Sequence, residues 1–477
     1  TLNGLTNGGS ANITYKQDGK DLLVDSAITS NGGNIVLDPP ANIDVNADVD
    51  AGGGNITAQA TNDININAGD LITTGAATIL VEADSDSSGA GNLSFGATGT
   101  NGSEKVRTGS GTVTLEGANV VVDDFAAATT GQMDITSGDG GIFSNAAGDD
   151  NPDAEAATMN LTANGAGIGQ AGGSTLEIDA TNVLNAEADG KIDLTSTGNL
   201  PVGLIEVDNG GTAQNVTITS AGNISDVDSG TSSDITNAAS LTLTAEDGIG
   251  ATGAGASIEF DADDVTATNN SNNGIFLNST GTGGVTLTNI TNNTDGAVEV
   301  LASEDVTVAD INTANNGNVL IQTSSANIII DDNSLNDVGD GDEDIVLTAN
   351  NNGNVTLNAL SNANVDILDI NASGQAIIGG IIAAADADFT IDSDTTEAQV
   401  NAAINTVKSL TVNDAIQFND VTVTTVANQI FNEAVEVDDD VTFTANVGTG
   451  TVQFVKTLNS AAGSDDGVAI TGNAVFN

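Results

Sequence analysis

The chain has 477 residues, with 66 Asp plus Glu against 7 Lys plus Arg and a formal net charge of −59. A surface this acidic repels phosphate backbones and anionic lipids, so nucleic acids and acidic membranes are excluded as partners, and no apolar run is long enough for membrane insertion. The chain has no Cys and no His, which excludes disulfides, thiol chemistry and the commonest general base.

The chain repeats one phrase, a Gly or Asn turn followed by a short run that alternates apolar residues with Thr or Asn. Copies begin at Gly33, Gly54, Gly91, Gly111, Gly284, Gly317 and Gly353. Alternation places Ile, Val and Leu on one face of a strand, and Asn-Gly supplies the positive φ that corners need. Strands this short cannot bury a face alone, so the copies must stack as a solenoid.

The spacing of these strands sets the size of one turn. Ile35 lies 21 residues before Ile56, and lesser strands such as 43–45 and 64–66 lie between the major ones. Spacings of about 20–25 residues are typical of a three-sided parallel β-helix, and parallel crossovers are right-handed. We therefore predict an all-β, right-handed parallel β-helix of roughly 18–22 turns, about 90–100 Å long if its turns stack about 4.8 Å apart.

Two Asn-rich stretches, 269–273 and 350–352, allow two interpretations. Their amides either stack as hydrogen-bonded ladders from turn to turn or simply form the turns.

The densest acidic cluster contains Asp340, Asp342 and Asp344. Alternate carboxylates of this kind can converge on one hard cation, so we predict these three residues as Ca²⁺ ligands, with Ca²⁺ as the candidate cofactor. An EF-hand would need Gly where Ile345 stands and an acidic residue where Asn351 stands, so the cluster is not an EF-hand. The alternative is a solvated loop between two turns.

Two further acidic clusters, at 261–264 and 438–440, raise the question of a polysaccharide-active β-helix enzyme with paired carboxylates. Such an enzyme also needs sugar-stacking aromatic residues and basic residues, but the chain has no Trp, one Tyr (Tyr15) and one Arg (Arg107). We therefore predict no catalytic residue and no enzymatic activity.

One segment departs from the strand pattern. Asp394 and Glu397 have capping-box spacing, and the apolar residues that follow have helical spacing. This predicts one short α-helix at about 395–409, after β-helix repeats over 1–394. Phe becomes denser in 410–477, which predicts further β-repeats or a small β domain that continues beyond the chain end.

Three stretches, 241–261, 274–277 and 441–454, resemble the repeats of giant bacterial surface β-helix proteins, the filamentous-haemagglutinin-like and autotransporter-like adhesins. The resemblance is a style of repeat that covers nearly the whole chain, and it identifies no binding residues. It implies a secreted bacterial protein, or a segment of one, at the cell surface, with roles in adhesion, biofilm or surface coats.

Together these observations predict an extracellular structural or adhesive protein, a stiff acidic rod that assembles into fibres or a cell-surface matrix. Its expected partners are cations, other copies of itself joined end to end or laterally, and a host or neighbouring-cell surface. Two alternatives stay open, namely a Ca²⁺-dependent surface-layer lattice protein and a polysaccharide-active enzyme.

Overall fold

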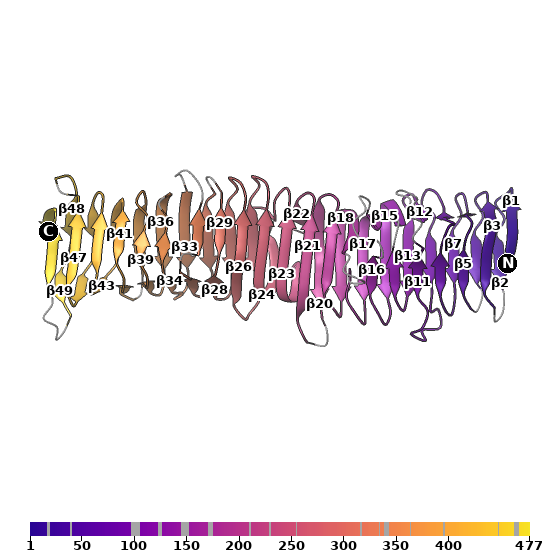
Figure 1. The fold of residues 1–477 in the computed structure, drawn as a ribbon, viewed down its shortest axis with the longest axis horizontal. Helices are drawn as coiled ribbons and strands as arrows, with labels where there is room; N and C mark the ends of the chain where they lie inside the picture. Colours follow the sequence, from indigo (N-terminus) through magenta and orange to yellow (C-terminus); the bar gives the residue numbers. More distant parts are fainter. Residues whose placement is uncertain are drawn as a thin grey trace. The chain divides into compact units, whose positions relative to one another are not determined.

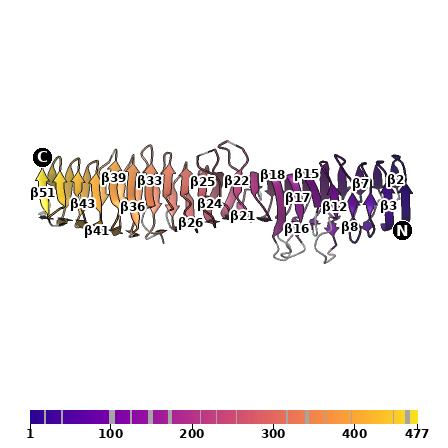
Figure 2. The ribbon, with the colours of Figure 1, turned by 90° about the horizontal axis from the view of Figure 1, so that it is seen from above.

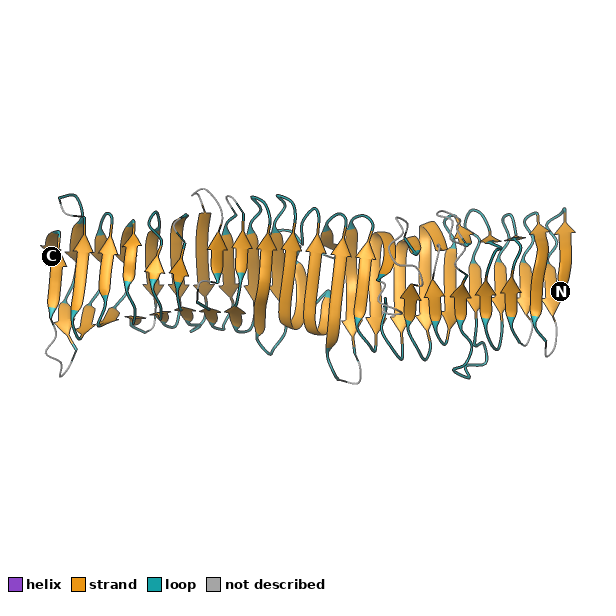
Figure 3. Cartoon of the chain, viewed as in Figure 1, coloured by secondary structure: helices purple, strands orange, loops and turns teal. Residues whose placement is uncertain are grey.

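The computed structural model describes residues 1–16, 20–38, 41–96, 105–122, 126–144, 152–169, 175–208, 211–228, 230–253, 255–314, 317–332, 334–337, 343–362, 364–394, 396–446, 448–461 and 467–477. Every regular element of these residues is a strand, and none is a helix (Figure 3). The strands stack in parallel as a β-solenoid of about 19 turns, which confirms the predicted fold class.

The chain divides into two units within β23 (Ile235–Ala245). The first unit comprises residues 1–229 and 234–242, and the second comprises 230–233 and 243–477. The other strands of the first unit are β1 (Leu2–Asn7), β2 (Ile13–Lys16), β3 (Leu22–Ser30), β4 (Ile35–Asp38), β5 (Ile43–Val45), β6 (Val49–Asp50), β7 (Ile56–Gln59), β8 (Ile64–Ile66), β9 (Leu71–Ile72), β10 (Ile79–Glu82), β11 (Leu93–Phe95), β12 (Val106–Thr108), β13 (Thr112–Gly117), β14 (Val120–Val122), β15 (Ala126–Ser137), β16 (Ile142–Ser144), β17 (Ala154–Ala163), β18 (Leu176–Ala188), β19 (Ile192–Ser196), β20 (Leu200–Val207), β21 (Gln214–Ser220) and β22 (Ile224–Asp226).

Strands of the first unit form three rows, as a three-sided turn requires. From β4 to β9 each strand pairs with the strand three places further along the chain, so that β4, β7 and β10 form one row, β5, β8 and β11 the second, and β6, β9 and β12 the third (Figure 1). Ile35, Ile56 and Ile79 stack in register and are buried. The interior is therefore built mainly from aligned columns of aliphatic side chains, and Phe95 of β11 joins one of these columns above Ile66.

The second unit continues from β23 with β24 (Ile258–Asn269), β25 (Ile275–Ser279), β26 (Val285–Asn292), β27 (Val298–Ala302), β28 (Val306–Val308), β29 (Ile311–Thr313), β30 (Val319–Thr323), β31 (Ile328–Ile330), β32 (Leu335–Asp337), β33 (Glu343–Ala349), β34 (Val355–Leu357), β35 (Leu360–Ser361), β36 (Val365–Ala372), β37 (Ala376–Ile378), β38 (Ile382–Ala383), β39 (Asp388–Ser393), β40 (Ala398–Val400), β41 (Ile404–Val407), β42 (Ser409–Val412), β43 (Ile416–Asn419), β44 (Thr422–Thr425), β45 (Gln429–Phe431), β46 (Val435–Asp438), β47 (Val441–Ala445), β48 (Thr451–Phe454), β49 (Leu458–Ser460), β50 (Val468–Thr471) and β51 (Asn473–Phe476).

Three rows recur in the second unit, and they run through the region where the sequence predicted a change of structure. One row contains β39, β42, β45, β48 and β51, a second contains β40, β43, β46 and β49, and the third contains β41, β44, β47 and β50 (Figure 2). The dense Phe residues lie inside these turns. Phe418, Phe431, Phe443 and Phe454 are buried, and their ring centroids lie 5.1 to 5.7 Å apart in the contacting pairs.

The predicted helix at 395–409 is wrong, because the described residues of this segment form β40, β41 and the start of β42. Val400, Ile404 and Val407 are all buried, and their spacing of four and then three imitates a helix. The spacing of four arises because a corner separates β40 from β41. The spacing of three arises because β41 is irregular at Thr406, where φ is 59° and the register with β44 shifts.

Candidate functional site

Amide side chains of successive turns form hydrogen-bonded ladders along the first unit. The backbone N–H of Asn34 donates to Asn12 Oδ1, that of Asn55 donates to Asn34 Oδ1, and that of Thr78 donates to Asn55 Oδ1, each at 3.0 Å. Asn34 and Asn55 are the Asn residues of the repeated phrase, directly before a strand. Their role is to satisfy a backbone donor of the next turn at a corner where the strand pairing stops.

A second ladder in this unit places amides between carboxylates. Asn42 Nδ2 donates to Asp21 Oδ1 at 3.0 Å, the backbone N–H of Asp63 donates to Asn42 Oδ1 at 3.0 Å, and the backbone N–H of Asn92 donates to Asp63 Oδ1 at 2.9 Å. Stacked turns lie about 4.8 Å apart, so two carboxylates in adjacent turns would repel strongly. The intervening Asn42 doubles that separation and supplies a donor to one carboxylate.

Ladders of this kind continue in the second unit. Asn269 Nδ2 donates to Asn292 Oδ1 at 2.8 Å in the interior, and Asn293 Nδ2 donates to Asn270 Oδ1 at 2.7 Å on the surface. The Asn-rich stretch 269–273 therefore forms ladders. In the stretch 350–352 the Nδ2 of Asn350 and Asn351 donate to backbone carbonyls one turn back, and positive φ angles at Asn351 and Asn352 form the turn itself.

The predicted Ca²⁺ ligands are described only in part, because Asp340 and Asp342 lie outside the described residues. Asp344 lies in β33, is half-buried, and its backbone N–H donates to Asn318 Oδ1 at 3.0 Å. The acidic residues Asp261, Asp263 and Asp264 lie exposed on β24. The prediction of a Ca²⁺ site at 340–344 therefore stays a prediction.

A carboxylate group that sequence reasoning missed lies in the second unit. Asp392 of β39, Asp394 directly after it and Asp414 after β42 each offer one carboxylate oxygen, and these oxygens lie within 4.8 Å of one another. Asp414 Oδ2 also accepts the backbone N–H of Ser393 at 3.1 Å. The signal was present in the spacing, because Asp414 follows Asp392 by about one turn, but the sequence alone did not give the register.

This proximity changes the proton affinity of Asp392. Its hydrogen bond with Asp414, together with burial and the charge of Asp414, raises the pKa of the Asp392 carboxyl from 3.8 to about 6. Two carboxylates this close share either a proton or a cation, because two adjacent negative charges repel each other. Asp392 and Asp394 also line a shallow polar groove of about 170 Å³ with Asn350, Asn371 and Ser373.

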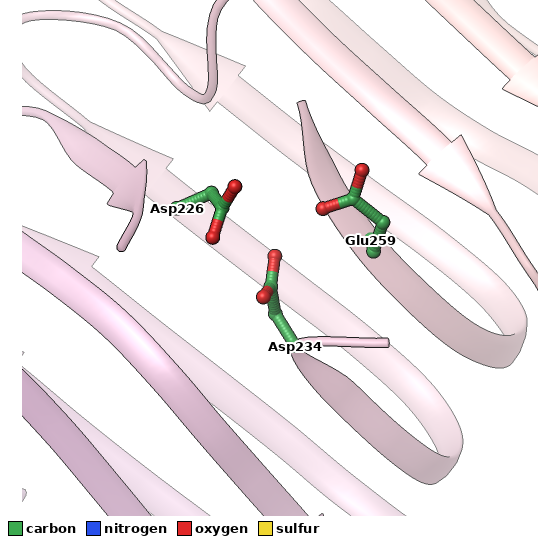
Figure 4. A group of neighbouring side chains, drawn as sticks. All are labelled: Asp226, Asp234 and Glu259. Carbon is green, nitrogen blue, oxygen red and sulfur yellow. The ribbon is translucent and has the colours of Figure 1, made fainter. Parts of the chain in front are cut away.

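The first unit contains a comparable pair. Figure 4 draws Asp226 and Asp234, whose carboxylates face each other, together with Glu259, a residue of the second unit. Asp234 is buried, Asp226 Oδ1 accepts the backbone N–H of Asp228 at 2.7 Å, and burial raises the pKa of the Asp226 carboxyl. In its own unit Glu259 is buried, and Ser257 Oγ and Asn278 Nδ2 donate to its Oε1 at 3.3 and 3.4 Å.

Several of the few basic side chains form ion pairs with carboxylates. Ion pairs join Lys16 to Asp38, Lys105 to Asp70, Lys191 to Asp193, Lys408 to Asp366 and Asp388, and Lys456 to Glu433. Such pairs account for a small part of the 66 acidic residues, so most of the negative charge must be balanced by ions from solution.

No protein-family model, curated protein or solved structure matches this chain. Among the described residues, no helix has the length and apolar character that a bilayer crossing requires. The similarity to surface adhesins therefore rests on the repeats of the sequence alone.

Proposed function

We propose that this chain is a structural and adhesive segment of an extracellular bacterial surface protein. The observation that carries the proposal is the parallel pairing of strands from turn to turn in each unit, around an interior of buried aliphatic side chains that Phe residues join in the later turns of the second unit. A solenoid of this kind resists bending and presents long rows of surface side chains. Such an architecture suits a spacer or scaffold more than a reaction that needs one deep pocket.

The acidic exterior supports an assembly that depends on cations. Side chains such as Asp261, Asp263 and Asp264 are exposed, and like-charged surfaces of two copies repel unless ions lie between them. Exposed strand edges of a solenoid also invite a further turn, from the same polypeptide or another copy.

Negative-stain electron microscopy of the purified chain tests this proposal, first with a few millimolar CaCl₂ and then with EDTA. Fibres or bundles in CaCl₂ that separate in EDTA are the expected result. Dispersed particles under both conditions would contradict the assembly part of the proposal. The chain would then be a spacer, and other parts of the protein would bind the partner.

A Ca²⁺-dependent surface-layer lattice is the second candidate, and the group formed by Asp392, Asp394 and Asp414 favours it because three carboxylates converge there. Ordered two-dimensional sheets in CaCl₂ would support the lattice over the fibre. The double variant Asp392→Asn/Asp414→Asn should lose the sheets. The matched control Asp263→Asn/Asp264→Asn removes the same charge from exposed positions of β24 and should keep them.

A further inference from the structure

The first unit holds one Lys side chain in an unusual setting. Lys105 precedes β12, Asp70 precedes β9, and these two strands pair in parallel in successive turns. Lys105 Nζ lies 3.6 Å from Asp70 Oδ1, with the Lys side chain 2% exposed and the Asp side chain 25% exposed. The backbone is held in place beside them, because the N–H of Leu71 donates to the carbonyl of Lys105 at 2.8 Å.

The Lys105 side chain is buried, yet its distance from Asp70 is long for an ion pair. A charge removed from water requires tight, charge-assisted contacts, which have lengths of about 2.7–2.9 Å. Among the described residues, the short ion pairs are instead on the surface: Lys16 with Asp38 at 2.6 Å, Lys408 with Asp388 at 2.8 Å and Lys456 with Glu433 at 2.6 Å, with Lys side chains 71%, 45% and 56% exposed. The most buried pair is thus longer than any of these three.

The surroundings of Asp70 raise the proton affinity of its carboxyl group. Burial raises the pKa of the Asp70 carboxyl, the charge of Lys105 lowers it, and the charge of Asp48 raises it. Asp48 is close, because its Oδ1 accepts the backbone N–H of Asp70 at 3.2 Å. A proton that moves from the ammonium to the carboxylate of such a pair leaves a neutral amine beside a neutral carboxylic acid, which are the two reactants of amide formation.

We propose that Lys105 and Asp70 are joined by an isopeptide bond. The ammonium first gives one proton to the carboxylate. The Lys105 Nζ lone pair then attacks Asp70 Cγ, the N–C bond forms, the C–OH bond breaks, and the hydroxyl leaves with a second proton of the amine as one water molecule. The ion pair is converted into an amide and water, so atoms and charge balance with no further reactant. The 3.6 Å contact between Lys105 Nζ and Asp70 Oδ1 holds the two groups together, and such preorganisation favours the attack.

This bond would tie one turn of the solenoid covalently to the next. The bond also eliminates two charges at a poorly hydrated position. An ion pair at 3.6 Å compensates the cost of burying those charges only in part. The inference concerns the covalent state of the chain and does not depend on the proposed function.

Mass spectrometry under denaturing conditions tests the proposal directly. The natural chain should be lighter than its sequence mass by one water, about 18 Da. Tandem mass spectrometry of a digest should find one branched peptide that contains both Lys105 and Asp70. The variants Lys105→Arg and Asp70→Ala should have their full sequence masses, because neither can form the bond.

Two results would overturn the proposal. One is a natural chain at its full sequence mass. The other is a water loss that persists in Lys105→Arg, which would assign it to cyclisation at an Asp-Gly sequence such as Asp139-Gly140. Lys408 and Asp388 provide an internal control, since this pair is closer but exposed and should yield only unbranched peptides.

Discussion

Asn acts in this chain as the residue that finishes each turn. The backbone N–H before a strand lies at a corner, and the side chain one turn back accepts it, as Asn34 does for Asn55. Asp can also accept such a bond, but a column of Asp would stack negative charges about 4.8 Å apart. The alternation of Asp21, Asn42 and Asp63 therefore reconciles a highly acidic surface with close stacking.

Replacing Asn42 with Asp tests this account. Asn42→Asp would place three carboxylates in adjacent turns and remove the donor to Asp21, so we expect a loss of about 1–2 kcal/mol in the free energy of unfolding at low salt. Urea denaturation measures it. The matched control is Asn34→Asp, whose neighbours Asn12 and Asn55 are uncharged, and it should change stability by less than about 0.5 kcal/mol. Equal losses in both variants would contradict the charge-separation account.

Protonation of Asp392 should make stability depend on pH. Its pKa is about 6 in the folded chain and 3.8 ordinarily, so the folded state holds a proton that the unfolded state releases. The stabilisation is fully present below pH 3.8 and is lost as pH rises through about 6. Burial also raises the pKa values of Asp70, Glu116 and Asp193, which act in the same direction.

Calorimetry should therefore find a higher Tm near pH 5 than near pH 7.5. Asp392→Asn resembles the protonated acid at every pH, so its Tm should rise less on acidification. Asp263→Asn removes a charge from an exposed position, and its Tm should change with pH as that of the natural chain does. If the Tm of Asp392→Asn changes with pH as much as that of the natural chain, Asp392 is not the source of the pH dependence.

At the scale of strands, the sequence predicts the strands and their stacking wherever apolar and polar residues alternate regularly. The columns through Ile35 and Ile56 were predictable because side-chain period and turn length agree there. The segment 395–409 was not, because a corner and the irregularity at Thr406 gave strand residues a helical spacing. The group of Asp392, Asp394 and Asp414 was missed for a related reason, since the contact depends on the register between turns rather than on any local motif.

Thr406 carries a backbone strain that can be relieved. A β-branched residue with φ of 59° is strained, whereas Asn tolerates this conformation. We expect Thr406→Asn to raise the free energy of unfolding by about 1 kcal/mol in urea denaturation. Thr422 is exposed on β44, the strand stacked on β41, and Thr422→Asn should lower stability because Thr favours extended strands. A loss of stability in Thr406→Asn would show that the irregularity needs Thr for another reason.

For the whole molecule, the net charge of −59 means that most carboxylates have no basic residue to balance them. Unfolding lets the carboxylates move apart, so their repulsion destabilises the folded state, and dissolved ions reduce this penalty. Screening acts on every exposed carboxylate, whereas specific binding acts only where several converge. The two effects can therefore be separated by comparing salts at equal ionic strength.

We expect the Tm to rise by several degrees between about 0.05 M and 0.5 M KCl, because the screening length falls from about 14 Å to about 4 Å. CaCl₂ at matched ionic strength should raise the Tm further, since Ca²⁺ binds only where carboxylates converge in the folded chain. The double variant Asp392→Asn/Asp414→Asn should lose part of this calcium excess and keep the response to KCl. A Tm that does not rise with KCl would contradict the role of self-repulsion. Equal effects of the two salts on the natural chain would instead show that its acidity serves screening alone, and would remove the support for a calcium-dependent assembly.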